Sequence, residues 1–198
     1  MTALLDTNQT PVHITTTEPR PATEYTVTVY GEPAGQGALS FKGKGVAIHT
    51  NEKKLKPWRT AISAAAQQAA GTHPYTALPK TKTGIALPSQ SCTLCGTSRR
   101  LHGLLDGPIG IEITISVAQP AAAAKRGDTR PANRTSSDID HHARAVLDAI
   151  THSSLWRDDA QVVELHARKV WAAGPGIDTL DRPGAVIHIW QLPTAVTQ

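Results

Sequence analysis

The chain has 198 residues, with 20 Lys and Arg against 16 Asp and Glu, a hydrophobic fraction of 39% and two cysteines. This length favours one domain with extensions over two full domains. One Cys-x-x-C pair excludes the disulfide framework of a small secreted domain, and no segment reaches the roughly 20 apolar residues that span a bilayer. Because the N-terminus also lacks a signal-peptide pattern, we expect a cytoplasmic, intracellular protein without membrane contact.

The first part of the chain predicts a tail, a strand and a helix. Residues 1–22 are rich in Thr and Pro, and we expect them to be disordered. Residues 24–30 alternate between apolar and polar, which predicts a half-buried strand, and a Gly-rich loop and a short strand at 46–48 follow. Residues 51–70 place apolar side chains at helical spacing. Four basic residues crowd the first half of this helix: Lys53, Lys54, Lys56 and Arg59.

The second part predicts an insertion and the remaining elements of a sheet. Residues 71–107 are dominated by Pro, Gly, Thr and Ser, and 108–118 alternate as a strand. The loop after that strand carries the basic residues Lys125, Arg126, Arg130 and Arg134. A helix from 139, a strand near 160–171 and a last strand near 184–192 complete the pattern. We expect an α+β fold with two layers, in which helices pack on one face of a mixed sheet, over residues 23–191 before a tail at 192–198.

Two acidic pairs stand out near the second helix. Asp138 and Asp140 flank its start, and Asp158 and Asp159 precede the following strand. If the pairs meet, their hard oxygen ligands suit Mg²⁺. The same residues also fit helix caps, turn positions or helix ion pairs with Arg144. An Asp-x-Asp motif occurs in nucleotide-sugar glycosyltransferases too, so the spacing leaves these interpretations open.

The longer string around these acids is more specific. Residues 137–171, SDIDHHARAVLDAITHSSLWRDDAQVVELHARKVW, resemble the signature of RusA-type Holliday junction resolvases, especially the phage-borne members. The elements in order are an Asp-x-Asp opening a helix, Asp148-Ala149-Ile150 at its end, a turn with Trp156, and Asp158-Asp159-Ala160-Gln161-Val162-Val163. The resemblance spans roughly residues 24–191 apart from the insertion.

The resemblance implies a homodimer that cuts four-way DNA junctions in recombination and repair, in the host cytoplasm if a phage encodes it. By position, Asp138, Asp140 and Asp159 are the expected Mg²⁺ ligands, and Mn²⁺ is expected to substitute. Arg144 stands where the family often has lysine; it keeps the charge but cannot donate a proton. His141 and His142 also depart from the family pattern, and we expect His142 to pack rather than to bind. The basic residues of the first helix and of the loop are expected to contact phosphates.

The Cys-x-x-C of the insertion has three interpretations that stay open. Cys92 and Cys95, with His102 seven residues on, could begin a zinc site whose fourth ligand is His73, a distant residue or one from a second copy. Two free thiols and a redox pair are the others. For the whole chain, the alternatives to a nuclease are a catalytically silent protein that binds branched DNA and an Asp-x-Asp transferase.

Overall fold

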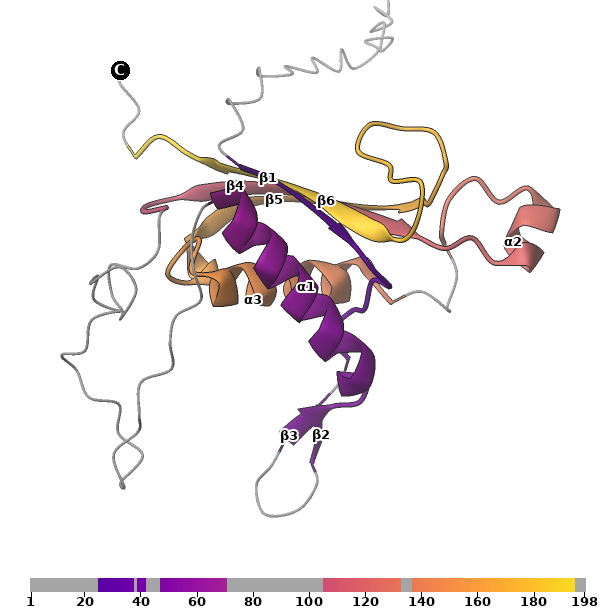
Figure 1. Ribbon diagram of the computed structural model, residues 1–198, viewed down its shortest axis with the longest axis horizontal. Helices are drawn as coiled ribbons and strands as arrows, with labels where there is room; N and C mark the ends of the chain where they lie inside the picture. The colour runs from indigo at the N-terminus through magenta and orange to yellow at the C-terminus, as the bar shows by residue number, and fades with distance from the viewer. Residues whose placement is uncertain (1–24, 38, 42–46, 71–104, 133–136, 195–198) are drawn as a thin grey trace, which may run out of the picture.

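The computed structural model describes residues 25–37, 39–41, 47–70, 105–132 and 137–194 (Figure 1). The expectations for the tail at 1–22, for Cys92, Cys95 and His102, and for Arg134 lie outside these residues. The predicted boundaries of the domain and of its insertion stay predictions. Among the helices that are described, none is both long and apolar enough to cross a membrane.

A four-stranded mixed sheet forms the centre of the fold. Its strands are β1 (Tyr25–Tyr30), β4 (Ile109–Val117), β5 (Val162–Trp171) and β6 (Gly184–Gln191), in the order β1-β6-β4-β5. β6 pairs antiparallel with both β1 and β4, whereas β5 pairs parallel with β4. Parallel neighbours need a crossover connection, and the chain between β4 and β5 supplies it.

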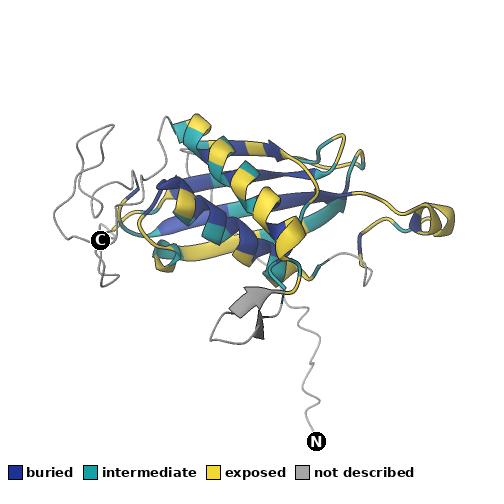
Figure 2. Cartoon of the chain, turned by 60° about the horizontal axis from the view of Figure 1, so that its bottom comes forward, coloured by how far each residue is buried: buried dark blue, intermediate teal, exposed yellow. Residues whose placement is uncertain are grey.

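Two helices cover one face of this sheet (Figure 1). α1 (Glu52–Ala70) packs near β1, and α3 (Ile139–Ser153) packs beside α1 and over β5. Figure 2 shows the buried residues of the helices and strands gathered between these layers. The core combines Leu55, Trp58 and Ile62 of α1 with the isoleucines of β4, all almost inaccessible to solvent. The predicted two-layer α+β fold is therefore confirmed.

The other side of the sheet carries a loop instead of helices. Residues 172–183 connect β5 to β6 and lie over this side, where the Leu180 N–H donates to the Ser116 hydroxyl of β4. Gly110 makes room there for the buried Trp190 ring, because a Cβ at Gly110 would lie 2.2 Å from a ring carbon. β4 is consequently buried along nearly its whole length.

Some elements differ from the sequence expectations. A short helix, α2 (Ala121–Arg126), lies inside the predicted basic loop, and Gly127 ends it in the left-handed conformation. The predicted short strand is present as β3 (Ala47–His49), and it pairs with an unpredicted strand, β2 (Leu39–Phe41). Sequence periodicity missed α2 and β2 because each spans too few residues to show a period.

Candidate metal site and nucleic-acid interface

The start of α3 presents a carboxylate that does not cap the helix. Asp138 occupies the N-cap position, with extended backbone angles, yet its side chain makes no capping hydrogen bond. An N-cap aspartate ordinarily accepts a bond from the first turn of its helix. The predicted N-cap position of Asp138 is therefore confirmed, but its carboxylate does not form the capping bond and is available to another partner.

Asp140 and His141 gather beside Asp138. One ligand atom from each of the three side chains lies within 4.8 Å of the other two, and both carboxylates are exposed. The Asp140 carboxylate also lies 3.8 Å from Nε2 of His141. Two carboxylates and an imidazole at this spacing can hold a divalent cation, with coordination positions left for water and phosphate.

Contacts from two other segments hold this end of α3 in place. The Lys169 ammonium of β5 donates to the Ser137 carbonyl at 2.9 Å, and the Gln36 N–H donates to the His141 carbonyl at 2.9 Å. Gly35 packs so closely that a Cβ there would lie 2.5 Å from the Ser137 Cβ. The Asp-x-Asp turn is therefore positioned by the Gly-rich loop and by β5.

His142 lies directly beneath this cluster and is only 1% exposed. Its burial lowers its pKa to about 4, and the positive charges of Lys169 and His141 act in the same direction, against an opposite effect of Asp138. Neither ring nitrogen has a hydrogen-bond partner within the part of the chain that is described. The predicted burial of His142 is confirmed. His142 also lines a cavity of about 440 Å³ together with Lys54 and Ser137.

In the second acidic pair, Asp158 has a structural role and Asp159 does not. Asp158 is the N-cap of the short 3₁₀ helix η2 (Asp159–Gln161) and accepts from the Ala160 N–H at 2.9 Å. The turn interpretation therefore holds for Asp158. The Asp159 carbonyl accepts from the Val162 N–H, but its side chain makes no hydrogen bond or ion pair to another described residue. Like the carboxylate of Asp138, the carboxylate of Asp159 therefore has no structural role within the described chain.

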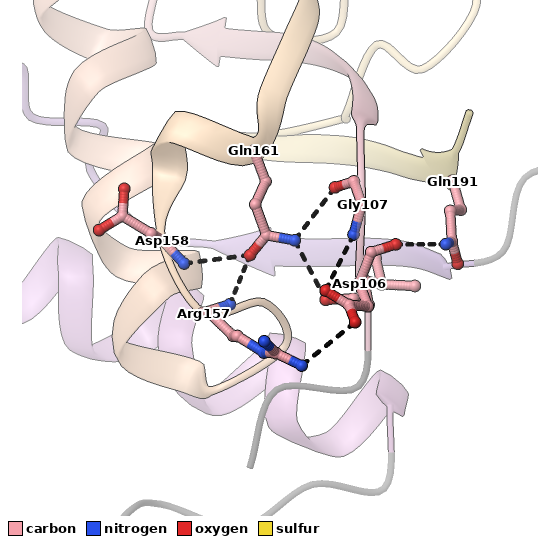
Figure 3. Close-up of polar contacts among 7 residues, drawn as sticks. Asp106, Gly107, Arg157, Asp158, Gln161 and Gln191 are labelled. Atoms are coloured by element: carbon pink, nitrogen blue, oxygen red, sulfur yellow. Dashed lines mark hydrogen bonds and ion pairs between the residues drawn. The ribbon is translucent and has the colours of Figure 1, made fainter. Parts of the chain in front are cut away.

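Gln161 connects this turn to the start of β4 (Figure 3). Its side-chain oxygen accepts from the N–H groups of Arg157 and Asp158, and its nitrogen donates to the carbonyls of Leu105 and Gly107. The Arg157 guanidinium also pairs with Asp106 at 3.2 Å. The hydrogen bonds of Gln161 therefore hold the turn at residues 158–161 in one conformation and fix the position of Asp159.

Within one chain the structure brings Asp138 and Asp140 together but does not bring Asp159 to them. Asp159 belongs to no three-residue acidic or histidine cluster among the described residues. Figure 1 shows the reason. The start of α3 lies near the C-terminal end of β5, whereas η2 follows the C-terminal end of α3 and precedes the start of β5. A 15-residue helix separates the two ends by roughly 22 Å.

Arg144 and most of the predicted DNA contacts are accessible. Arg144 is exposed on α3 and forms no ion pair with another residue that the structure describes. The helix pairs considered for it are absent, because Asp148 pairs with Arg59 of α1 at 3.3 Å. Arg126 pairs with Asp128 at 2.6 Å. The remaining described basic candidates are all exposed: Lys53, Lys54, Lys56, Lys125 and Arg130.

Comparisons with known proteins indicate the class of protein to which this chain is similar. The family model described as endodeoxyribonuclease RusA matches residues 93–179, a segment that holds both acidic pairs, all of α3 and β5. The match supports a nuclease acting on DNA. In particular, it confirms the resemblance to the RusA-type Holliday junction resolvases. An uncharacterized protein of Bacillus subtilis (strain 168), YqaN, is 22% identical over 165 residues, covering 78% of this chain and 93% of that protein.

Proposed function

We propose that this protein is a Mg²⁺-dependent endodeoxyribonuclease that resolves four-way DNA junctions by paired cuts in recombination and repair. The observation that carries the proposal is the carboxylate of Asp138. It starts a helix without capping it, and it lies next to the carboxylate of Asp140 inside the RusA-matched segment. An exposed carboxylate pair in which Asp138 makes no capping bond fits a ligand set for a hard cation better than a helix terminus.

The donor set fits magnesium. Asp138 and Asp140 would offer carboxylate oxygens to the cation. Asp159 is the third ligand that the family resemblance implies, although it does not lie beside them within one chain. Bound Mg²⁺ would polarise the scissile phosphate and lower the pKa of an attacking water molecule. Mn²⁺, which also prefers oxygen ligands, is expected to substitute.

The aspartates and the arginine of α3 have different roles in the proposed reaction. Asp138 and Asp140 hold the cation at the start of α3, where Lys169 and Gln36 keep the turn in position. Arg144 lies one turn further along α3 and is exposed, so it can bind a phosphate oxygen. Because a guanidinium stays protonated, Arg144 contributes charge and not a proton.

The basic residues supply contacts that do not depend on base sequence. Lys53, Lys54 and Lys56 lie on the first turns of α1, and α2 carries Lys125 on a segment that stands out from the body of the molecule (Figure 1). Exposed lysines of this kind bind phosphates and release counterions. Arg59 and Arg126 also have carboxylate partners, so we expect smaller contributions from them.

The test compares wild-type protein with Asp140→Asn on a labelled four-way junction, with and without Mg²⁺. We expect paired nicks that need the metal and fall at least about 100-fold in the variant, since even changes beside metal ligands cost 10- to 100-fold. Binding of the junction should persist. Asp181→Asn is a matched control, because Asp181 is an exposed acid in the loop before β6.

The main alternative predicts a different result in the same assay. A catalytically silent protein would bind the junction in Mg²⁺ or Mn²⁺ without nicking it. Absence of both binding and nicking would reject both DNA functions.

A further inference from the structure

A polar cavity lies beside the start of α3. It has a volume of about 440 Å³ and is formed where the segment after β1, the start of α1, the loop after β4 and the start of α3 meet. Its lining includes Glu32, Lys54, Gln119, Ser137 and His142. The volume falls within the range of roughly 300–1,000 Å³ that is typical of small-molecule sites, and it far exceeds the space of one water molecule. This space, called the α3 cavity below, can therefore hold an organic ring system.

The walls of the α3 cavity suit a flat ring. Trp171, at the end of β5, lines the cavity, and its indole N–H donates to the Asp128 carbonyl at 2.8 Å, which holds the indole in place. Val117 and Pro120 add apolar surface to the lining. Aromatic side chains stack on the face of a nucleobase whatever its identity. The walls thus offer an unstacked base a surface that replaces its neighbours in the DNA.

Polar groups at the α3 cavity have hydrogen-bonding capacity that the described chain does not use. The exposed Glu32 carboxylate and Lys54 ammonium form no ion pair with another described residue. Gln119 donates from its side-chain nitrogen to the Asp128 carbonyl, which leaves its side-chain oxygen as an acceptor toward a ligand. Carboxylate and amide oxygens accept from the amino groups of bases, and a lysine binds phosphate.

His142 adds a buried group that packing alone does not explain. It is 1% exposed and lines the α3 cavity, and neither ring nitrogen has a partner among the described residues. A buried polar group without a hydrogen bond costs free energy that an apolar side chain of similar size would not cost. The edge of a nucleobase carries both donors and acceptors, so such an occupant would supply a partner when the ring turns toward the cavity.

We propose that the α3 cavity receives one unstacked nucleobase of the junction DNA, next to the phosphate that is cut, and that Glu32 and Gln119 select a base with an exocyclic amino group. Ser137 connects the cavity to the candidate metal site, because it lines the cavity and directly precedes Asp138. The inference rests on the proposed nuclease function, since that function is what brings a DNA phosphate to Asp138 and Asp140.

A branch point lowers the cost of taking a base out of the stack. Base pairs there lack a regular stacking neighbour on one side, and extrusion costs least for bases that are already poorly paired. Enzymes that read an extruded base bind its hydrogen-bonding edge and stack it between aromatic or apolar side chains. The α3 cavity offers both kinds of contact. Cutting should therefore depend on the base at one position beside the branch point.

Fluorescence of 2-aminopurine tests base uptake without metal or cutting. The probe is placed at single positions around the branch point, and its emission rises when it leaves the stack. With wild-type protein bound in EDTA, we expect a rise at one position and little change at the others. Ala118→Phe should abolish this rise, because the exposed Ala118 lines the cavity and a phenyl ring would occupy it.

The matched control is Ala69→Phe. Ala69 is an exposed alanine near the end of α1 and does not line the cavity, so the localised rise should persist in this variant. Wild-type protein that binds the junction without a localised rise would overturn the proposal. An equal rise with Ala118→Phe would also overturn it.

Cutting rates in Mg²⁺ test the selection of the base. Junctions that differ only in the base pair at the identified position are compared. We expect cytosine, adenine or guanine in the cavity to give cutting about 10-fold faster than thymine, because a well-formed contact to a base edge discriminates by about this factor. Glu32→Ala should remove most of this preference. Glu52→Ala is the matched control, since Glu52 is an exposed acid of α1 outside the cavity. An unchanged preference in Glu32→Ala would overturn the selection by this carboxylate.

The two assays separate the failure of this proposal from the failure of the nuclease function. A localised rise without cutting in Mg²⁺ or Mn²⁺ would reject the nuclease function and retain base uptake. Cutting without a localised rise would reject base uptake and retain the nuclease function. If wild-type protein binds no junction, both proposals fail.

Discussion

At the residue scale, hydrogen bonds separate the aspartates that build structure from those that are free to bind. Asp158 caps η2 and accepts a backbone N–H, whereas Asp138 stands at a cap position without using it. Both are acids at the start of a helical segment, and local sequence cannot tell them apart. The geometry therefore assigns Asp158 a structural role and groups Asp138 with Asp140, whereas Asp159 stays a predicted ligand that lies apart from them within one chain.

His142 leads to a prediction about stability and pH. Because burial lowers its pKa to about 4, the folded chain holds the ring neutral where the unfolded chain binds a proton below pH 6.5. The contribution of the neutral His142 ring to the free energy of unfolding is complete above pH 6.5. This contribution is lost as the pH falls from 6.5 to about 4. The difference of about 2.5 pKa units corresponds to about 3 kcal/mol.

The measurement is denaturant unfolding from pH 7 to pH 4 in the presence of EDTA. His142→Leu should reduce the loss of stability over this range, since the variant has no ring to protonate. His152→Asn is the matched control, because His152 is exposed near the other end of the same helix. Equal pH dependence of wild type and His142→Leu would contradict the prediction.

At the element scale, the short turn before β5 depends on one amide side chain. Gln161 closes the capping box with Asp158 and binds two carbonyls at the start of β4. It therefore holds the position of Asp159 relative to the sheet. Removal of the amide would leave partly buried carbonyl groups without their donors, which is costly.

We expect Gln161→Ala to lower the free energy of unfolding by about 2 kcal/mol, because several hydrogen bonds are lost together. Urea unfolding at neutral pH measures this. The control is Gln119→Ala, since Gln119 is exposed and donates one bond to the Asp128 carbonyl, and its loss should cost less than about 0.5 kcal/mol. Similar costs for both variants would show that the turn does not depend on Gln161.

At the scale of the whole molecule, the net charge of +4 is less informative than where the basic residues lie. Exposed lysines stand at the start of α1 and on α2, and Arg144 is exposed on α3. The carboxylates of Asp128 and Asp148 already bind Arg126 and Arg59. Binding of junction DNA should accordingly depend on a few free cations and weaken steeply with salt.

Replacing Lys53, Lys54 and Lys56 together by alanine should weaken junction binding and flatten its salt dependence. Each lost phosphate contact reduces the slope of log K against log salt by about 0.9. Titrations at several salt concentrations measure this slope. Arg182→Ala is the control, since Arg182 is equally exposed but lies over the Tyr30 ring in the loop before β6. An unchanged slope in the triple variant would exclude α1 from the interface.

Hydrophobic periodicity and local motifs were sufficient to predict much of this fold. The strands at β1, β4 and β6, the helices α1 and α3 and the two-layer arrangement follow from apolar residues repeating at strand or helix spacing. The candidate ligands came from an ordered motif and not from periodicity. α2, β2 and the exposure of β5 could not be predicted, since they depend on short segments or on which strand lies at the edge of the sheet.

The sequence by itself determined which residues are the candidates for the chemistry, because residue type and spacing are local properties. Only the tertiary structure decided where these residues lie. β4 and β5 are parallel, so α3 must run back along the sheet between them, and the residues before β5 end up far from the residues before α3. This separation of Asp159 from Asp138 and Asp140 arises from strand direction, which no local pattern encodes.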